Sequence, residues 1–272
     1  MRVTLLGTGD TAGTPVPRCD CATCTRARET GIERSRFSVH VENGRTGESL
    51  LIDASPDFRS QFLATDVPLP DEAIITHVHF DHLDGLGNVY RLLPELDVHA
   101  ANETDPETGE SVAETVSRRY AYLDQVTVHP RSPFEPFEAA GFSIELLPVD
   151  HPPLLSYGLR IEGEDATLAL TGDTSYAIPA RSRDRLRDAD LLLADAIVPA
   201  AMCEKHPLGG RHEDEDGVPR SFGTKHLTRE GALALAEELD AEAVRLVHLS
   251  HRYPVEEAFG PKLGVDGEQI DL

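Results

Sequence analysis

The sequence predicts an α/β protein that folds as a single domain over residues 1–272. Short apolar runs rich in branched residues alternate with helical patterns, and they do so along the whole chain. No internal repeat or linker-like stretch divides the sequence, and 40% hydrophobic residues suffice for one large core. A further observation is that metal-capable side chains recur where the apolar runs stop.

The expected elements follow from the apolar pattern and from turn and cap residues. We expect strands at Arg2–Leu6, Phe37–Val41, Ser49–Asp53, Ala73–Thr76, Asp97–Ala101, Phe142–Pro148, Tyr157–Ile161, Thr167–Thr171, Leu191–Asp195 and Ala243–His248. We expect helices at Cys21–Glu29, Pro56–Leu63, Leu83–Leu93, Pro106–Ala121, Arg181–Ala189 and Thr228–Leu239. Two antiparallel hairpins are expected, one turning at Asn43-Gly44 and one at Gly163.

The composition is strongly acidic, with 48 acidic and 25 basic residues and a formal net charge of −23. Such a surface repels free nucleic acid and anionic membrane at ordinary salt. The pattern is typical of proteins from high-salt cytoplasms, where the Debye length falls to about 3 Å at 1 M salt. No run approaches the roughly 18 apolar residues of a membrane span, and the N-terminus lacks signal-peptide features. We therefore expect a halophilic, cytoplasmic protein.

Residues 76–85 carry the strongest motif, H-x-H-x-D-H, formed by His77, His79, Asp81 and His82. The motif directly follows the apolar run Ala73–Ile75, so it lies on the loop that leaves a buried strand. Imidazoles and a carboxylate at this spacing suit Zn, Mn or Fe. The alternative is a histidine-rich surface loop, which the recurrence of ligand candidates downstream disfavours.

Three further candidates end later strands: His151, Asp173 and His248. Taken singly, each has a structural alternative, such as an Asx turn at Asp173. Taken together, they place polar ligands where apolar strands stop, on loops held by a rigid scaffold. Asp173, with two free oxygens, can bridge two cations. Gly7-Thr8-Gly9 lacks the remaining features of a nucleotide-binding loop and predicts only a tight turn.

The four cysteines divide into a group and a single residue. Cys19-x-Cys21-x-x-Cys24 predicts three thiolates of a metal site that lacks its fourth ligand, because a disulfide framework is rare in a long cytoplasmic chain. Cys203 stands alone and is expected to be an ordinary buried thiol.

These residues together resemble the metallo-β-lactamase superfamily across essentially the whole chain. The resemblance implies a four-layer αβ/βα sandwich of two mixed sheets with outer helices. It implies that His77, His79 and His151 hold one metal ion, that Asp81, His82 and His248 hold another, and that Asp173 bridges them. Asp53 corresponds to a buried carboxylate that orients a ligand instead of binding metal.

Within that superfamily, the three cysteines and His251 resemble the PhnP-type cyclic phosphodiesterases of the carbon–phosphorus lyase pathway. There, the resemblance implies, Cys19, Cys21, Cys24 and His251 bind a structural zinc. Asp81 and His226 are then the predicted catalytic residues, with His226 protonating the leaving oxygen. His206 and His212 are rivals for that role; they lie in Lys205–Ser221, a segment expected to be a mobile loop.

The resemblance implies a metal-dependent hydrolase with two catalytic Mn or Zn ions and one structural Zn. Its expected substrate is a small cyclic phosphodiester, best 5-phosphoribosyl 1,2-cyclic phosphate, opened to ribose 1,5-bisphosphate. Arg18, Arg36 and Arg220 are open candidates for binding the distal phosphate.

Two alternative functions remain. One is tRNA 3′-end processing, for which no basic Gly/Pro-rich arm is evident, and the other is a metal-binding protein without turnover. A relative in pyrroloquinoline quinone biosynthesis also carries a cysteine cluster, and a homodimer is possible because relatives are often dimers.

Overall fold

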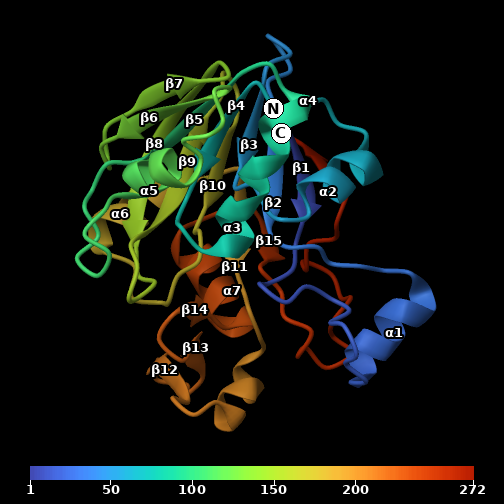
Figure 1. Cartoon of the computed structure of the whole chain (residues 1–272). Coiled ribbons are helices and arrows are strands. Elements are labelled where there is room, and N and C mark those ends of the chain that lie inside the picture. The colour runs from blue at the N-terminus through green and yellow to red at the C-terminus, as the bar shows by residue number, and fades with distance from the viewer.

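The computed structural model describes all of residues 1–272 and contains two large β-sheets with helices outside them (Figure 1). The seven-stranded sheet has the order β16-β1-β2-β3-β4-β5-β6, and the six-stranded sheet has the order β15-β11-β10-β9-β8-β7. A small third sheet contains β12 (Gly210–Glu213), β13 (Pro219–Phe222) and β14 (His226–Leu227). The predicted four-layer αβ/βα sandwich is confirmed.

The elements have the following bounds. The seven-stranded sheet consists of β1 (Arg2–Gly7), β2 (Ser38–Glu42), β3 (Ser49–Ile52), β4 (Glu72–Ile75), β5 (Leu96–Ala101), β6 (Val126–Arg131) and β16 (Gln269–Asp271). The six-stranded sheet consists of β7 (Phe137–Ala139), β8 (Phe142–Val149), β9 (Ser156–Glu162), β10 (Thr167–Leu170), β11 (Leu191–Asp195) and β15 (Ala243–Val247). The helices are α1 (Ala22–Thr30), α2 (Phe58–Thr65), α3 (Phe80–Leu83), α4 (Val89–Leu92), α5 (Val112–Arg119), α6 (Ala180–Leu186) and α7 (Arg229–Glu238), with 3-10 helices η1 (Asp84–Asn88) and η2 (Ala200–Lys205).

One apolar core joins the two sheets. It contains 41 buried residues and draws side chains such as Val3 and Ile52 from the first sheet and Leu159 and Leu193 from the second. Fully burying each such side chain contributes about 1.5–3 kcal/mol to stability. A second cluster of 19 residues lies between the six-stranded sheet and the helices α6 and α7. None of the helices has the length and apolar character that a membrane-spanning helix requires.

The strand directions bring the ends of distant segments together. The strands β3, β4, β5 and β6 pair in parallel, as do β10, β11 and β15, whereas the two predicted hairpins, β2–β3 and β9–β10, are antiparallel as expected. Parallel strands deliver their carboxyl ends to one edge of a sheet. Asp53 and His77 therefore leave one sheet, and Asp173 and His248 leave the other, on the same side of the molecule.

Two predicted helices differ from the structure. The helix expected at Leu83–Leu93 begins earlier and is divided into α3, η1 and α4. Its interruption has a packing reason, because a Cβ on Gly85 would lie 1.9 Å from the backbone oxygen of Ser55. The helix expected at Pro106–Ala121 is only α5, since Ser111 and Glu114 form a capping box that fixes its start.

The segment Lys205–Ser221, expected as a mobile loop, instead contains a hairpin. The strands β12 (Gly210–Glu213) and β13 (Pro219–Phe222) pair in antiparallel fashion, and β13 then pairs with β14 (His226–Leu227). We call residues 210–227 the arm; it projects at the bottom of Figure 1. The strands β6, β7 and β16 were also not predicted.

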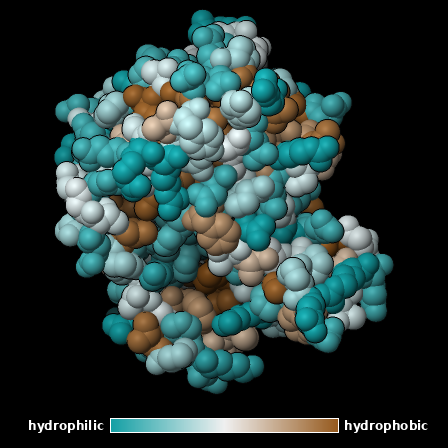
Figure 2. All heavy atoms as spheres, viewed as in Figure 1, coloured by the Kyte–Doolittle hydropathy of each residue, from teal (hydrophilic) through white to brown (hydrophobic).

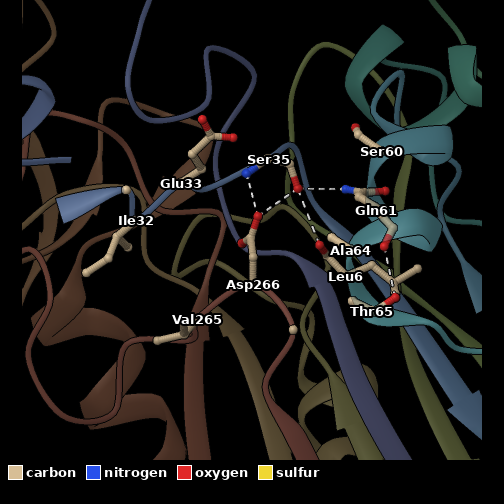
Figure 3. Close-up of a pocket in the computed structure, with 12 residues that line it drawn as sticks. Leu6, Ile32, Glu33, Ser35, Ser60, Gln61, Ala64, Thr65, Val265 and Asp266 are labelled. Atoms are coloured by element: carbon tan, nitrogen blue, oxygen red, sulfur yellow. Dashed lines mark hydrogen bonds between the residues drawn. The ribbon is translucent and has the colours of Figure 1, made fainter. Parts of the chain in front are cut away.

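The C-terminal segment is held against the first loop by a partly buried carboxylate, Asp266 (Figure 3). Its Oδ1 accepts hydrogen bonds from the Thr8 amide and hydroxyl, at 2.9 and 2.7 Å, and its Oδ2 accepts from the Ser35 amide and hydroxyl, at 2.6 and 2.7 Å. These bonds form one side of a pocket of about 410 Å³ that none of the predicted metal ligands lines. The network therefore links the C-terminal segment to the first loop, and it is separate from the site described below.

Candidate metal centres

Three histidine nitrogens converge at the end of β4. His77 and His79 lie on the loop between β4 and α3, and His151 follows β8. The Nδ1 atom of His79 lies 3.0 Å from His77 Nε2 and 3.2 Å from His151 Nε2. Three lone-pair nitrogens at this separation are the arrangement that a shared cation stabilises. The structure thus brings together the first predicted ligand set.

The second predicted set gathers beside the first. Asp81 and His82 lie on α3, and His248 directly follows β15. The Oδ2 atom of Asp81 lies 3.7 Å from His82 Nε2 and 3.6 Å from His248 Nε2. All three side chains are nearly inaccessible to solvent, so their polar atoms must find partners within the site.

Asp173 lies between the two sets. Its Oδ2 atom is 3.8 Å from His77 Nε2, 3.4 Å from His82 Nε2 and 3.2 Å from His248 Nε2. The preceding Gly172 has φ +61°, and a Cβ there would approach the backbone oxygen of Tyr157 to 2.6 Å. Glycine is therefore required for the turn that carries Asp173 into its position.

The residues present fit two divalent cations. The buried Nε2 atoms of His82 and His248 have no hydrogen-bond partner, which is costly unless a metal ion occupies their lone pairs. Metal–ligand bonds of about 2.0–2.1 Å in a tetrahedral site separate the ligand atoms by about 3.3 Å. The observed separations, from 3.0 to 3.8 Å, bracket that value. The donor set of imidazoles and carboxylates suits zinc, among other divalent metals.

Asp53, predicted to orient a ligand, is the centre of a hydrogen-bond network that includes His82. His82 Nδ1 donates to Asp53 Oδ2 at 2.6 Å, which leaves Nε2 of the same ring for metal. The Thr76 amide and hydroxyl each donate to Asp53 at 2.8 Å. Asp53 and His248 both have positive φ, 59° and 58°, a conformation that is uncommon for residues other than glycine. Such strain persists where the surrounding structure holds it, which is typical of functional sites.

Charge is distributed unequally between the two sets. Burial lowers the pKa of His151 to about 3 and also lowers the pKa of His77. Burial opposes the charge on His248 as well, but the carboxylates of Asp173 and Asp81 outweigh it and raise the pKa of His248 to about 9. The negative potential is thus concentrated around the second set, on the carboxylates that a cation would neutralise.

His226 lies over both sets and is oriented by a residue that the sequence reasoning missed. Its Nδ1 donates to Asp195 Oδ2 at 2.9 Å, and its ring stacks on His248 with centroids 5.0 Å apart. The ring centroid of His151 is 4.9 Å away. Asp195 ends β11 and is fully buried; a strand-terminal aspartate with no neighbouring histidine in sequence gave no signal beyond its place at a strand end.

The rival histidines and the candidate arginines lie elsewhere. His206 packs on Phe222, with ring centroids 4.2 Å apart, and His212 pairs with the Ser221 hydroxyl at 2.8 Å. Neither belongs to a group of potential metal ligands. Arg36 pairs with Asp57, and Arg220 pairs with Asp214 and Asp216, so both guanidinium groups are already neutralised. Arg18 is exposed and forms no ion pair.

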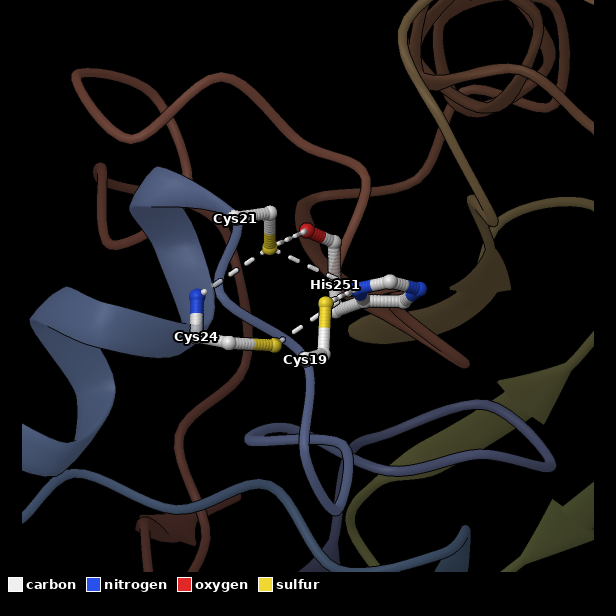
Figure 4. Close-up of side chains that lie close together, drawn as sticks. All are labelled: Cys19, Cys21, Cys24 and His251. Atoms are coloured by element: carbon white, nitrogen blue, oxygen red, sulfur yellow. Dashed lines mark hydrogen bonds between the residues drawn. The ribbon is translucent and has the colours of Figure 1, made fainter.

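The cysteine group forms a second, separate cluster (Figure 4). The Sγ atoms of Cys19, Cys21 and Cys24 lie 3.6, 3.5 and 3.5 Å from Nδ1 of His251. Zn–S bonds of about 2.3 Å and Zn–N bonds of about 2.0 Å give a ligand separation of about 3.5 Å, so the cluster fits tetrahedral zinc. Burial raises the pKa of Cys24 to about 12, and metal coordination would deprotonate this thiol. Cys203 is buried, as expected, and belongs to no group of potential metal ligands.

Comparison with known proteins identifies the family. Residues 48–249 match the model of the beta-lactamase superfamily domain. A solved structure of a diphosphatase from the PhnP family has 29% sequence identity and a TM-score of 0.77, with 99% of this chain and 97% of that chain covered.

Two curated relatives show what else this sequence resembles. A Porphyromonas gingivalis protein named octanoyltransferase is 28% identical over 266 residues, which cover 94% of this chain. The match covers 47% of that protein, so the chain spans about half its length. Ribonuclease Z of Mycobacterium bovis is 26% identical over 219 residues, 73% of this chain and 69% of that protein. Because residues 48–249 match the family model and the fold is the two-sheet sandwich, the chain belongs to the metallo-β-lactamase superfamily of metal-dependent hydrolases. Within that superfamily it resembles the PhnP proteins.

Proposed function

We propose that the protein is a two-metal phosphodiesterase that hydrolyses small cyclic phosphodiesters. The observation that carries the proposal is the position of His226. Its ring lies against His151 of one ligand set and His248 of the other, and Asp195 binds its Nδ1. A proton donor beside a pair of cations is the combination that cleavage of a phosphate ester with a poor leaving group requires.

In this proposal each residue has a defined task. His77, His79 and His151 would hold one ion, Asp81, His82 and His248 would hold the other, and Asp173 would serve both. Bound divalent ions would lower the pKa of a water nucleophile and neutralise the phosphoryl oxygens. His226 Nε2 donates its proton to the departing oxygen, because Nδ1 is engaged by Asp195. Asp195 thereby fixes the tautomer and the plane of the ring, and it stabilises the charged imidazole before the proton leaves.

Several observations favour a small substrate. The PhnP-family diphosphatase acts, by its name, on phosphate groups, and it matches nearly the entire chain. The arm that carries His226 has four consecutive acidic residues, 213–216, and the net charge of the chain is −23. Both features repel a long polyanion. The best candidate is 5-phosphoribosyl 1,2-cyclic phosphate, opened to ribose 1,5-bisphosphate, with two Mn or Zn ions in the site and one structural Zn.

The alternative is endonucleolytic processing of tRNA 3′ ends. It is favoured by the similarity to ribonuclease Z over 73% of this chain. Against it stands the net charge of −23, since a surface that grips RNA needs cations to bind the phosphate backbone. A metal-binding protein without turnover is the remaining alternative, and the oriented His226 argues against it.

A set of three assays tests the proposal. The Mn²⁺- or Zn²⁺-loaded protein should hydrolyse bis-p-nitrophenyl phosphate and open cyclic phosphodiesters, and it should hydrolyse phosphomonoesters poorly. Assays should include high salt, where an acidic chain is least subject to self-repulsion. Cleavage of a tRNA precursor without activity on any cyclic phosphodiester would favour the alternative. Absence of turnover on all substrates, with metal bound, would contradict both enzymatic functions.

A further inference from the structure

Asp195 uses only one of its two carboxylate oxygens. Its Oδ2 accepts hydrogen bonds from Nδ1 of His226 at 2.9 Å and from the amides of Thr174 and Leu227 at 3.2 and 3.3 Å. Its Oδ1 is buried and has no hydrogen-bond partner. Because a buried carboxylate oxygen without a partner costs free energy, a further donor is expected at Oδ1.

The donor that faces this oxygen belongs to His248, a predicted metal ligand. Its Nδ1 lies 3.7 Å from Asp195 Oδ1 and is itself buried without a hydrogen-bond partner. The rings of His226 and His248 stack, with centroids 5.0 Å apart and an interplanar angle of 13°. One carboxylate therefore lies beside the Nδ1 atoms of two nearly parallel rings, 2.9 Å from the first and 3.7 Å from the second.

The other buried histidines of the two ligand sets each have a partner for Nδ1, which leaves Nε2 for metal. These partners, at 2.6, 2.9 and 3.0 Å, are Asp53 for His82, the Lys225 carbonyl for His151 and the Thr76 hydroxyl for His77. A histidine that binds metal through one nitrogen almost always uses the other to bond a carboxylate, a carbonyl or a water. His248 lacks such a bond, and Asp195 is the carboxylate next to its Nδ1.

The surroundings of the pair leave room for one water molecule. A cavity of about 10 Å³ is lined by Asp195 and His248 together with apolar side chains such as Leu193 and Val247, and this is about the volume that a single water needs. Figure 2 shows the molecule hollowed below α3, between the α1 lobe and the arm that carries the partly accessible His226. Asp195 and His248 are only 1% and 3% exposed, so bulk solvent does not serve them.

We propose that Asp195 positions His248 as well as His226: Oδ1 accepts a hydrogen bond from Nδ1 of the metal ligand, directly or through one buried water, while Oδ2 holds the proton donor. Each ring then presents Nε2, one to a metal ion and the other to the leaving oxygen. The role given to His226 rests on the proposed function, which this inference deepens by joining the metal ligand and the proton donor through one carboxylate. The effect on metal binding is independent of turnover.

Metal titration compares variants that keep both ligand sets intact. EDTA-treated Asp195→Ala, Asp195→Asn and His226→Ala are titrated with Mn²⁺ beside the wild type. We expect Asp195→Ala to weaken the binding of one catalytic ion by about 10- to 100-fold, the usual worth of a group that orients a metal ligand. His226→Ala is the matched control, because it removes the other ring held by Asp195, and it should bind both ions as the wild type does. Asp195→Asn should stay within about threefold of the wild type, since an amide also forms hydrogen bonds to an imidazole or a water.

A second measurement uses the wild type, so it does not depend on the folding of a variant. In a crystal structure of the Mn²⁺-loaded protein, Nδ1 of His248 should lie within about 3.2 Å of Asp195 Oδ1, or of one water that also contacts this oxygen. A loaded structure with neither contact would overturn the inference, as would equal Mn²⁺ affinities of Asp195→Ala and the wild type; Asp195 would then serve His226 alone. Wild-type protein that binds Mn²⁺ but does not turn over any phosphodiester would refute the proposed function and leave the metal-binding result standing.

Discussion

The two candidate metal clusters of this chain are built in opposite ways. The His/Asp ligands lie at the carboxyl ends of strands from both sheets and on α3. Residues outside the ligand sets hold these side chains in place, as Asp53 holds His82. The cysteine cluster lies on a loop and on the first turn of α1, and Cys19 and Cys21 are only partly buried. The Val16 amide donates to Cys24 Sγ and the Cys24 amide donates to Cys21 Sγ, while the Thr23 hydroxyl donates to the Tyr253 carbonyl and the Arg28 guanidinium to the Cys19 carbonyl.

This comparison indicates a difference in what each metal does. At the His/Asp cluster the fold positions the ligands, so the ions can exchange and serve chemistry. At the cysteine cluster the ligands come from a loop and from His251, three residues beyond His248. An ion bound there would add a further link between the N-terminal loop and the end of β15, beside hydrogen bonds such as that from the Asp10 amide to the Leu249 carbonyl. A closed Cys₃His set with no open position suits a structural role.

The largest expected effect is that of Asp173→Ala, because its Oδ2 lies within 3.8 Å of His77 Nε2 in one catalytic ligand set and 3.2 Å from His248 Nε2 in the other. Affinity for both ions should fall by more than about 100-fold, since even partners that only orient a metal ligand are worth 10–100-fold. Turnover should fall to background while the cysteine-bound zinc is retained. Elemental analysis and an assay with bis-p-nitrophenyl phosphate check this. The exposed Asp184 on α6 supplies the control variant Asp184→Ala, which should behave as wild type; two catalytic ions and near-normal turnover in Asp173→Ala would show that Asp173 does not bridge.

His226→Ala is expected to separate proton donation from metal binding. Metal content should be unchanged, and turnover should fall by roughly 10²–10⁴ for substrates with poor leaving groups. The loss should be smaller with p-nitrophenolate, which departs without a proton. Asp195→Asn should reduce turnover less, because the imidazole remains but its orientation is no longer held. With His212→Ala as the control on the arm, an equal loss for good and poor leaving groups would assign His226 to binding the phosphate.

The smallest effect on activity, and a clear one on stability, is expected from Cys21→Ser. Loss of the structural zinc should lower the melting temperature by roughly 5–10 °C, because a few kcal/mol of binding energy is lost at about 2–4 °C per kcal/mol. Turnover should stay within about threefold of wild type, since none of the four zinc ligands belongs to the two catalytic ligand sets. Cys203→Ala removes a thiol outside the cluster and should leave zinc content unchanged. Unchanged zinc in Cys21→Ser would remove the cysteine cluster as a metal site.

The sequence was most informative where ligands terminate strands. His77, His151, Asp173 and His248 each follow an apolar run, and the sheets bring these ends together because neighbouring strands run in parallel. The arm was not predicted, because its hairpin is polar and lacks the alternation that a half-buried strand shows.

Other features depend on contacts that local sequence does not contain. The strand β6 carries Pro130, which an edge strand tolerates but which weakens a strand pattern. Asp195 gains its role only from the approach of residues distant in sequence, such as His226, 31 positions later in the chain.

Metal content before and after chelation tests the central claim, two catalytic ions and one structural zinc, most directly. We predict three ions per chain in the loaded protein. Dialysis against EDTA should remove two of them together with all phosphodiesterase activity, and Mn²⁺ should restore both, while one zinc remains bound throughout. Loss of all three ions in a single step, or full activity with only the cysteine-bound zinc present, would contradict the account.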